Sequence, residues 1–267
     1  MGVNRHNQFY LTLPSNSSMK YYPNNTTANF TTHLPTSINL GNGEWEVALV
    51  EAHYPNSFVT IGNDAVIRVE TFDVSKVGEP KGDGSPASTL STIKVKSGLY
   101  SDIPHLLGVI NARTEDATFT FKQDTRTVEI STSGAVKNIE LSITLSLVLG
   151  FDPTERDLKK NNRSVRPADI HAALPSHMYV YCDLVEPQFV GDTVAPMLKI
   201  VNLGTSSGEY KYGANKLVHF TDPHYVPMMK TSFESVEIDL RDSTGQHLPF
   251  HFGATCMKLH LRRSVNS

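Results

Sequence analysis

Apolar and polar residues alternate with a period of two through most of this sequence, and this alternation restricts the fold more than any other feature. A strand with one buried and one exposed face has this pattern, whereas the apolar face of a helix repeats every 3.6 residues. Many short strands without helices between them predict an all-β sandwich or barrel. The alternating segments are Phe9–Leu13, Trp45–Glu51, Val66–Phe72, Ile93–Lys96, Met178–Leu184, Met197–Val201, Phe233–Leu240 and Cys256–Arg262.

Two local features modify this strand pattern. In the segment Phe233–Leu240 the apolar spacing breaks at Glu234-Ser235, which predicts a bulge or a later start of the strand. The segment Gly78–Ser88 is rich in Gly, Pro and Ser, which favour turns over regular elements. We therefore expect a loop between the strands at Val66–Phe72 and Ile93–Lys96.

The alternation gives way to a mixed pattern between about Gly98 and Ala168. Ser101 is expected to cap a helix, because an acidic residue and Pro104 follow it in the first turn. Apolar residues then recur at i, i+3, i+4 and i+7, which places them on one helix face. They are Ile103, Leu106, Leu107 and Ile110.

A hairpin and a second helix follow. Thr118–Phe121 and Thr127–Ile130 alternate on either side of a short polar turn, as the strands of a hairpin do. Ser142 is expected to cap a short helix, and Gly150 is expected to end it. Helix, hairpin and helix together predict a small α/β unit within the β chain.

The domain organisation follows from this interruption. The polar and basic segment Arg156–Arg166 is interpreted as the connector back to the strands. We expect residues 1–97 and 169–267 to form the β-sandwich, and residues 98–168 to form the inserted α/β subdomain together with its basic connector.

Composition excludes several classes of protein. Of the 267 residues, 39% are hydrophobic, which is enough to bury a core. The net charge of −3 argues against a protein whose main task is to wrap duplex nucleic acid. The start of the chain, Met1–His6, lacks the apolar stretch of a signal peptide, so we expect entry into the cytosol or nucleus. The longest apolar run, Leu145–Phe151, is far shorter than the roughly 18 residues of a membrane span.

The sequence contains no recognisable catalytic, metal or cofactor motif. Its 11 histidines are scattered; His219 and His224, for example, do not have the spacing of a zinc motif. Cys182 and Cys256 lie in alternating apolar stretches and are interpreted as small buried hydrophobic residues, with a disulfide between them left open. We expect a protein that is not an enzyme and that needs no cofactor or metal.

One dense basic cluster stands out, and its members are Lys159, Lys160, Arg163 and Arg166. These residues are candidates for contact with nucleic acid or with an acidic partner surface. The alternative is a solvated face of the connector. We expect that nucleic acid contact is not the primary role.

An ordered set of short motifs gives the chain a family resemblance. It comprises Phe9–Asn16, Tyr22–Asn25, Trp45–Pro55, Ser97–Ser101, Ile110-Asn111, Leu141-Ser142, Leu149–Phe151, His224–Pro227, Phe233–Asp242 and Leu259–Arg263. In this order the motifs resemble the minor capsid (penton) proteins encoded by Polinton/Maverick self-synthesising transposons and by the related adintoviruses. The resemblance covers nearly the whole chain.

The resemblance implies a single jelly roll, with two four-stranded sheets facing each other. It implies a structural virion protein without catalytic residues, five copies of which close the fivefold vertex of an icosahedral shell. Its partners would be itself, as a homopentamer, and a double-jelly-roll major capsid protein, with assembly inside the host cell. The first and last strands, Phe9–Leu13 and Cys256–Arg262, would then be neighbours in one sheet.

Two other functions remain open. A β-sandwich attachment module would recognise a glycan or receptor, with its site on the inserted unit. An enzyme on a β-rich scaffold would need Cys182 or Cys256 within hydrogen-bonding reach of a histidine.

Overall fold

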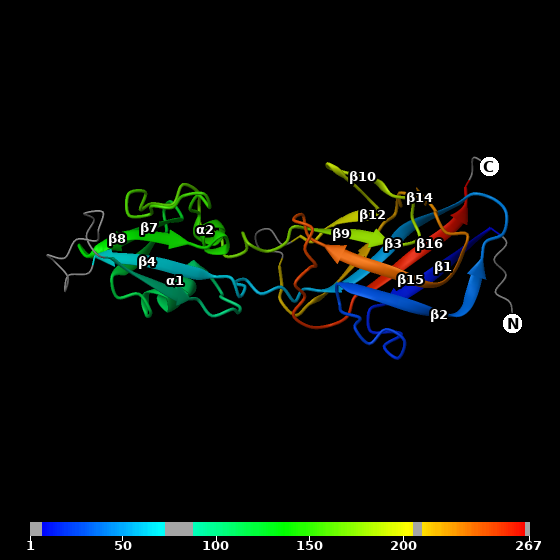
Figure 1. The fold of residues 1–267 in the computed structure, drawn as a ribbon, viewed down its shortest axis with the longest axis horizontal. Helices are drawn as coiled ribbons and strands as arrows, with labels where there is room; N and C mark the ends of the chain where they lie inside the picture. The colour runs from blue at the N-terminus through cyan, green and yellow to red at the C-terminus, as the bar shows by residue number, and fades with distance from the viewer. Residues whose placement is uncertain (1–6, 73–87, 205–209, 265–267) are drawn as a thin grey trace. The chain divides into compact units, whose positions relative to one another are not determined.

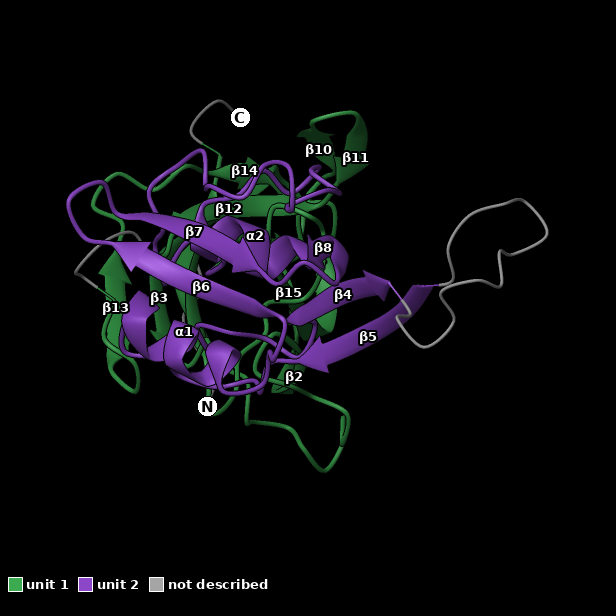
Figure 2. Cartoon of the chain, turned by 90° about the vertical axis from the view of Figure 1, so that its left-hand side faces the viewer, with its two compact units in different colours: residues 1–58, 175–267 green, residues 59–174 purple. Residues whose placement is uncertain are grey.

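The computed structural model describes residues 7–72, 88–204 and 210–264, and its chain divides into two compact units (Figure 2). Unit 1 comprises Met1–Phe58 and Pro175–Ser267, and unit 2 comprises Val59–Leu174. Of the loop expected at Gly78–Ser88, all but the last residue lies outside the described residues.

Unit 1 contains two large antiparallel sheets, and most of their strands are labelled in Figure 1. The first sheet has the order β1-β16-β3-β13, with the short β14 also paired to β3, and the second has the order β12-β9-β15-β2. The first sheet contains β1 (Gln8–Pro14), β3 (Trp45–Pro55), β13 (Asn215–His219), β14 (Val226–Pro227) and β16 (Cys256–Arg263). The second sheet contains β2 (Asn29–Asn39), β9 (His177–Cys182), β12 (Met197–Asn202) and β15 (Ser232–Arg241).

This strand order is that of a jelly roll, in which successive strands pass between two facing four-stranded sheets. The first and last strands are neighbours, as expected, because Phe9 of β1 lies opposite Leu261 of β16. The second strand of the chain, β2, likewise pairs with the second strand from the C-terminal end, β15. The all-β, single-jelly-roll prediction is confirmed.

The alternating pattern of each strand explains which face is buried. In β15 the side chains of Phe233, Val236, Ile238 and Leu240 are buried, and the register to β2 shifts between Phe233 and Ser235. The bulge expected from the spacing at Glu234-Ser235 is therefore present. Buried side chains from both sheets form the core of unit 1, and the largest include Leu13, Phe30, Leu49 and Phe58.

Unit 2 is an α/β unit with a core of its own. Its sheet has the order β5-β4-β8, and a separate hairpin joins β6 and β7. The core contains 24 buried residues, all of them between Ile61 and Ile170. The elements are β4 (Val66–Phe72), β5 (Ser88–Lys94), α1 (Ile103–Asn111), β6 (Ala117–Lys122), β7 (Thr127–Thr132), β8 (Val136–Leu141) and α2 (Ile143–Leu149).

The start of α1 differs by one residue from the expectation. Asp102, not Ser101, is the N-cap, and its carboxylate accepts a hydrogen bond from the backbone N–H of His105 at 2.8 Å. A carboxylate satisfies an unpaired N–H group of the first turn as well as a hydroxyl does, so the sequence pattern allowed either residue. The expected apolar face is correct, because Ile103, Leu106, Leu107 and Ile110 are all buried.

The end of α2 lies at Gly150, as the sequence predicts. Gly150 has the left-handed conformation, with φ of 80°. A Cβ atom at this position would lie 2.2 Å from the carbonyl oxygen of Arg166, so the close approach of two backbone segments also requires glycine. Ser142 precedes α2 with extended backbone but makes no side-chain cap; its hydroxyl instead accepts from the N–H of Val66.

The bounds of unit 2 are wider than the expected insertion of residues 98–168. Strands β4 and β5, which we assigned to the sandwich, pair with each other, and β4 also pairs with β8. Ile67 and Val69 of β4 are buried in the core of unit 2, opposite Leu141 and Ile139. The alternation in β4 therefore reflects burial of one face in the core of unit 2, to which α1 and α2 also contribute, and not burial against a second sheet of the sandwich.

The segment Arg156–Arg166 is also not a free connector. The backbone N–H of Ile130 donates to the carbonyl of Asn162 at 2.7 Å, and Leu158 is buried in the core of unit 2. An isolated bridge links Glu129 and Arg163. The segment therefore packs along β7, because Leu158 is buried in the core and the backbone of Asn162 is hydrogen-bonded to that of Ile130.

Candidate functional site

All four residues of the basic cluster lie exposed on one segment of unit 2, and each has a partner within the unit. Lys160 forms an ion pair with Asp157 at 3.6 Å, and Arg163 with Glu129 at 3.7 Å. Lys159 donates from Nζ to the carbonyl of Val136, and Arg166 donates from Nη2 to the carbonyl of Phe151 at 3.2 Å. Two of the four positive charges are thus compensated by carboxylates, which weakens the cluster as an electrostatic surface.

Both cysteines are free thiols, which answers the question of a disulfide between them. Burial raises the pKa of the Cys182 thiol to about 12. Burial also raises the pKa of Cys256. Because the thiolate is the nucleophile, these environments oppose the thiol chemistry that an enzyme on this scaffold would need.

Within residues 7–72, 88–204 and 210–264, no three side chains from His, Cys, Asp and Glu are grouped so as to hold a metal ion. Neither α1 nor α2 has the length and apolar character needed to cross a membrane.

The face of the first sheet that points away from the core carries a connected polar network. Arg262 donates from Nε to Glu46 at 2.6 Å, and its guanidinium lies 3.4 Å from the centre of the Tyr225 ring. The Tyr225 hydroxyl lies 2.7 Å from Nδ1 of His260, whose Nε2 lies 3.1 Å from Oε1 of Gln8. Five residues from β1, β3, β16 and the segment before β14 are thereby fixed in one chain of contacts.

His260 is 7% exposed because aromatic rings cover it on two sides. The Tyr10 ring stacks on the imidazole at a centroid distance of 4.5 Å, and Tyr225 contacts it edge-on at 5.8 Å. Burial, and secondly the charge of Arg262, lowers the pKa of His260. The lowered pKa favours the neutral imidazole. Because Oε1 of Gln8 can only accept, the neutral form that fits both contacts carries its proton on Nε2, which donates to Gln8, and Nδ1 accepts from the Tyr225 hydroxyl.

The network continues around Glu51 of β3. Lys258 donates to Glu51 at 2.7 Å, and His53 and His219 lie 3.6 and 3.7 Å from the same carboxylate. The hydrogen bond from Lys258 lowers the pKa of Glu51, and the same bond raises the pKa of Lys258. Sequence reasoning missed this face, although the alternation in β16 places Lys258, His260 and Arg262 on one side of the strand.

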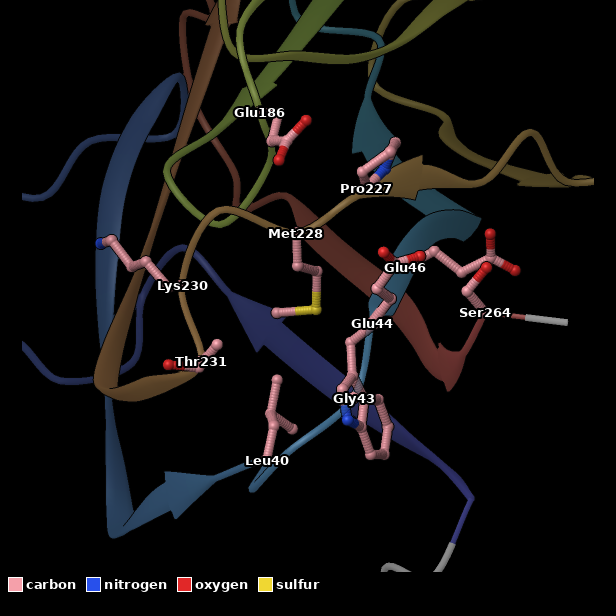
Figure 3. Close-up of a pocket in the computed structure, with 11 residues that line it drawn as sticks. Leu40, Gly43, Glu44, Glu46, Glu186, Pro227, Met228, Lys230, Thr231 and Ser264 are labelled. Carbon is pink, nitrogen blue, oxygen red and sulfur yellow. The ribbon is translucent and has the colours of Figure 1, made fainter. Parts of the chain in front are cut away.

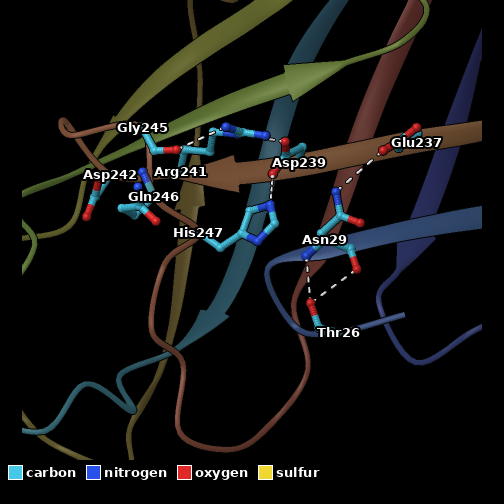
Figure 4. Close-up of polar contacts among 9 residues, drawn as sticks. All are labelled: Thr26, Asn29, Glu237, Asp239, Arg241, Asp242, Gly245, Gln246 and His247. Carbon is cyan, nitrogen blue, oxygen red and sulfur yellow. Dashed lines mark hydrogen bonds and ion pairs between the residues drawn. The ribbon is translucent and has the colours of Figure 1, made fainter. Parts of the chain in front are cut away.

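A second polar cluster ties the loop after β15 to the strand (Figure 4). Asp239 accepts from Nε of Arg241 at 2.8 Å, and its other carboxylate oxygen lies 3.1 Å from Nε2 of His247. Arg241 also donates to the carbonyl of Gly245 at 3.0 Å. Asp239, Arg241 and Gly245 border a cavity of about 430 Å³ that is also lined by Cys182, but the thiol there is held protonated by burial.

A hairpin of β10 (Gln188–Val190) and β11 (Thr193–Ala195) projects from the rest of unit 1 in both overall views (Figures 1 and 2). Phe189 and Val194 lie directly opposite each other across the hairpin. They are 89% and 58% exposed, which makes Phe189 an aromatic side chain with almost no cover within the chain.

A cavity of about 420 Å³ lies at the end of the sandwich where β2 and β14 end and β3 begins (Figure 3). Its apolar lining includes Leu40, Trp45 and Met228, and its polar lining includes Glu44 and Glu186. Trp45 is 6% exposed, and its indole N–H is buried without a hydrogen-bond partner among the residues that the structure describes. An unsatisfied buried donor costs roughly 1–3 kcal/mol, so this group needs an explanation.

No model of a known protein family matches the chain, and no curated protein matches it. The chain is similar to the crystal structure of the mavirus penton protein, with 12% sequence identity and a TM-score of 0.48 over 96% of this chain and 99% of that chain. It is also similar to a chain in the cryo-EM structure of the Sputnik virophage, with 13% identity and a TM-score of 0.48 over 96% and 98% of the two chains.

Proposed function

We propose that this chain is a structural virion component, a minor capsid (penton) protein that forms homopentamers at the fivefold vertices of an icosahedral capsid. The observation that carries the proposal is the strand order of unit 1, β1-β16-β3-β13 facing β12-β9-β15-β2, which is a single jelly roll. Jelly rolls of this kind are used by viral capsid proteins, among others. Because one fold can serve many functions, the choice of a capsid role rests on the ordered motifs that resemble Polinton/Maverick and adintovirus pentons.

The finer points of the proposal follow from the same sequence resemblance. The neighbours in the shell would be trimers of a double-jelly-roll major capsid protein, and the particle would be built inside the host cell. The role is structural and not enzymatic, which agrees with the high pKa of the Cys182 thiol.

A ring of five identical chains needs two different surfaces on each copy, because the contact between neighbours is heterologous. Each contact must bury roughly 1,000 Å² or more, with aromatic and aliphatic side chains at its centre. Unit 1 exposes several such side chains on its strands and loops. They are Tyr10, Tyr21, Phe189, Val194, Leu217, Met229 and Phe252.

The mass of the purified chain in solution tests the proposal. Light scattering coupled to gel filtration should give five times the 29.5 kDa of the chain, and electron microscopy should show closed rings. A stable monomer at the highest soluble concentration that also binds a glycan on an array would contradict the proposal. That result would instead support an attachment module.

A further inference from the structure

The cavity at the end of the sandwich is built from segments that are far apart in the sequence. Leu40 follows β2, Glu44 directly precedes β3 and Trp45 begins it, Met228 follows β14, and Glu186 precedes β10. Backbone hydrogen bonds fix these walls, since Met228 donates to the carbonyl of Trp45 at 2.9 Å and Glu186 donates to that of Pro227 at 3.0 Å. The cavity is therefore a preformed feature of unit 1, with a volume in the range of ligand pockets.

The apolar part of the cavity is suited to one inserted side chain. Figure 3 shows the side chains of Met228 and Leu40 pointing toward each other across the space, with Glu186 and Glu44 on different sides of Met228. Met228 has an unbranched, polarizable side chain, which adapts to an inserted group at little cost. The indole N–H of Trp45, buried and unpaired, supplies a donor beside this apolar surface.

The charges around the cavity do not cancel. Glu46 is paired with Arg262 at 2.6 Å, and Lys230 is paired with Asp183. Glu44 and Glu186 are exposed and have no ion pair within the described part of the chain. Arg263 also lies near the cavity, with its guanidinium 6.0 Å from the centre of the Trp45 ring. The described rim thus offers two carboxylates without an ion pair, whereas its lysine, Lys230, is already paired, and this arrangement favours a positively charged occupant.

We propose that this cavity is a docking site for an extended peptide segment of another protein, in which an apolar side chain neighbours a Lys or Arg. The apolar side chain inserts between Leu40 and Met228, and the cation lies against Glu44 or Glu186. A backbone carbonyl of the peptide accepts from the indole N–H of Trp45 once the Met228 side chain shifts to admit it. A peptide can supply the apolar side chain, the cation and the carbonyl acceptor together, because its backbone carries a carbonyl beside every side chain.

The chain contains a single tryptophan, Trp45, so tryptophan fluorescence reports on the surroundings of this residue in the cavity wall. Short random peptides displayed on phage are selected on the full chain, and the selected peptides are synthesised and titrated while Trp45 emission is recorded. We expect the selected sequences to share an apolar residue next to Lys or Arg, and their binding to shift the Trp45 emission.

A charge-reversed variant and a matched control make the test specific. Glu44→Lys with Glu186→Lys should weaken peptide binding by roughly tenfold or more, because it removes the carboxylates that attract the cation. Glu115→Lys with Glu234→Lys changes the net charge equally at exposed positions outside the cavity and should leave binding unchanged.

Three outcomes would overturn the proposal. The first is a selection that yields only peptides bound equally by the Glu44→Lys/Glu186→Lys variant. The second is a change of Trp45 emission on dilution of the chain without peptide, which would make a second copy the occupant. The third is an apolar dye that shifts the emission equally in both charge variants and displaces every selected peptide, which would indicate a site for small apolar molecules.

Discussion

The side chains of Gln8 and His260, 252 residues apart in the sequence, lie 3.1 Å from each other (Oε1 to Nε2). The contact joins the first strand of the jelly roll to the last, and it places a nearly buried imidazole between Gln8 and Tyr225. The outer face of the sheet is therefore held by a polar group whose protonation state depends on the fold.

This contact predicts that the stability of unit 1 falls in mild acid. Burial lowers the pKa of His260 below its usual 6.5, so the unfolded chain binds the proton more readily than the folded chain. Stability is fully present above about pH 6.5 and is lost as the pH falls toward the lowered pKa of the folded state, by about 1.4 kcal/mol for each pKa unit of difference. Urea unfolding followed by Trp45 fluorescence at pH 7.5 and 5.5 measures this loss.

Two variants separate His260 from the other histidines. His260→Gln removes the titrating group and should reduce the difference in unfolding free energy between pH 7.5 and 5.5. His251→Gln, at an exposed position, should leave the difference as it is in the unchanged chain. An equal difference in His260→Gln and in the unchanged chain would show that other groups cause the pH dependence.

Gly150→Ala should destabilise unit 2 strongly. The left-handed backbone alone costs an alanine roughly 1–2 kcal/mol, and at Gly150 the added Cβ would also lie 2.2 Å from the carbonyl oxygen of Arg166. Gly245→Ala is the matched control, since Gly245 has φ of 82° but open space around its Cβ position. Chemical unfolding should show a larger loss for Gly150→Ala, and equal losses would contradict the close approach.

The sequence predicted those parts of the fold that depend on local pattern. The bulge in β15, the hairpin of β6 and β7, the apolar face of α1 and the end of α2 at Gly150 all follow from the spacing of residues near each other in the chain. The neighbouring positions of β1 and β16 followed only from the family resemblance, because no local pattern specifies a partner so far away.

The features that the sequence did not predict depend on contacts between residues far apart in the chain, which local alternation does not specify. Alternation in β4 is the same whether the strand joins the sandwich or pairs with β8, so its place in unit 2 was missed. The network on the outer face of the first sheet brings together Gln8, Glu46, Tyr225, His260 and Arg262, which lie on four segments. The basic cluster was visible in the sequence, but its carboxylate partners were not, since Glu129 lies on β7 and reaches Arg163 only through the fold.

Replacing Lys159, Lys160, Arg163 and Arg166 together by Ser should leave the fold intact. The ion pairs of Lys160 and Arg163 are exposed, and such pairs contribute roughly 0.2–1 kcal/mol each. The hydrogen bonds of Lys159 and Arg166 to backbone carbonyls are partly buried, but both residues are exposed. Circular dichroism should match the unchanged chain, with a small loss in the free energy of unfolding, and a variant that fails to fold would show that the cluster is structural.

Residues 59–174 should fold when expressed alone, because the core of unit 2 is drawn entirely from this segment. A dispersed NMR spectrum and a cooperative unfolding transition would verify this. Within the fragment, Leu145→Ala should cost about 2–5 kcal/mol, since Leu145 is fully buried on α2. Ile143→Ala on the same helix should cost far less, because Ile143 is 62% exposed. A fragment without a cooperative transition, or equal effects of the two substitutions, would mean that this core depends on the rest of the chain.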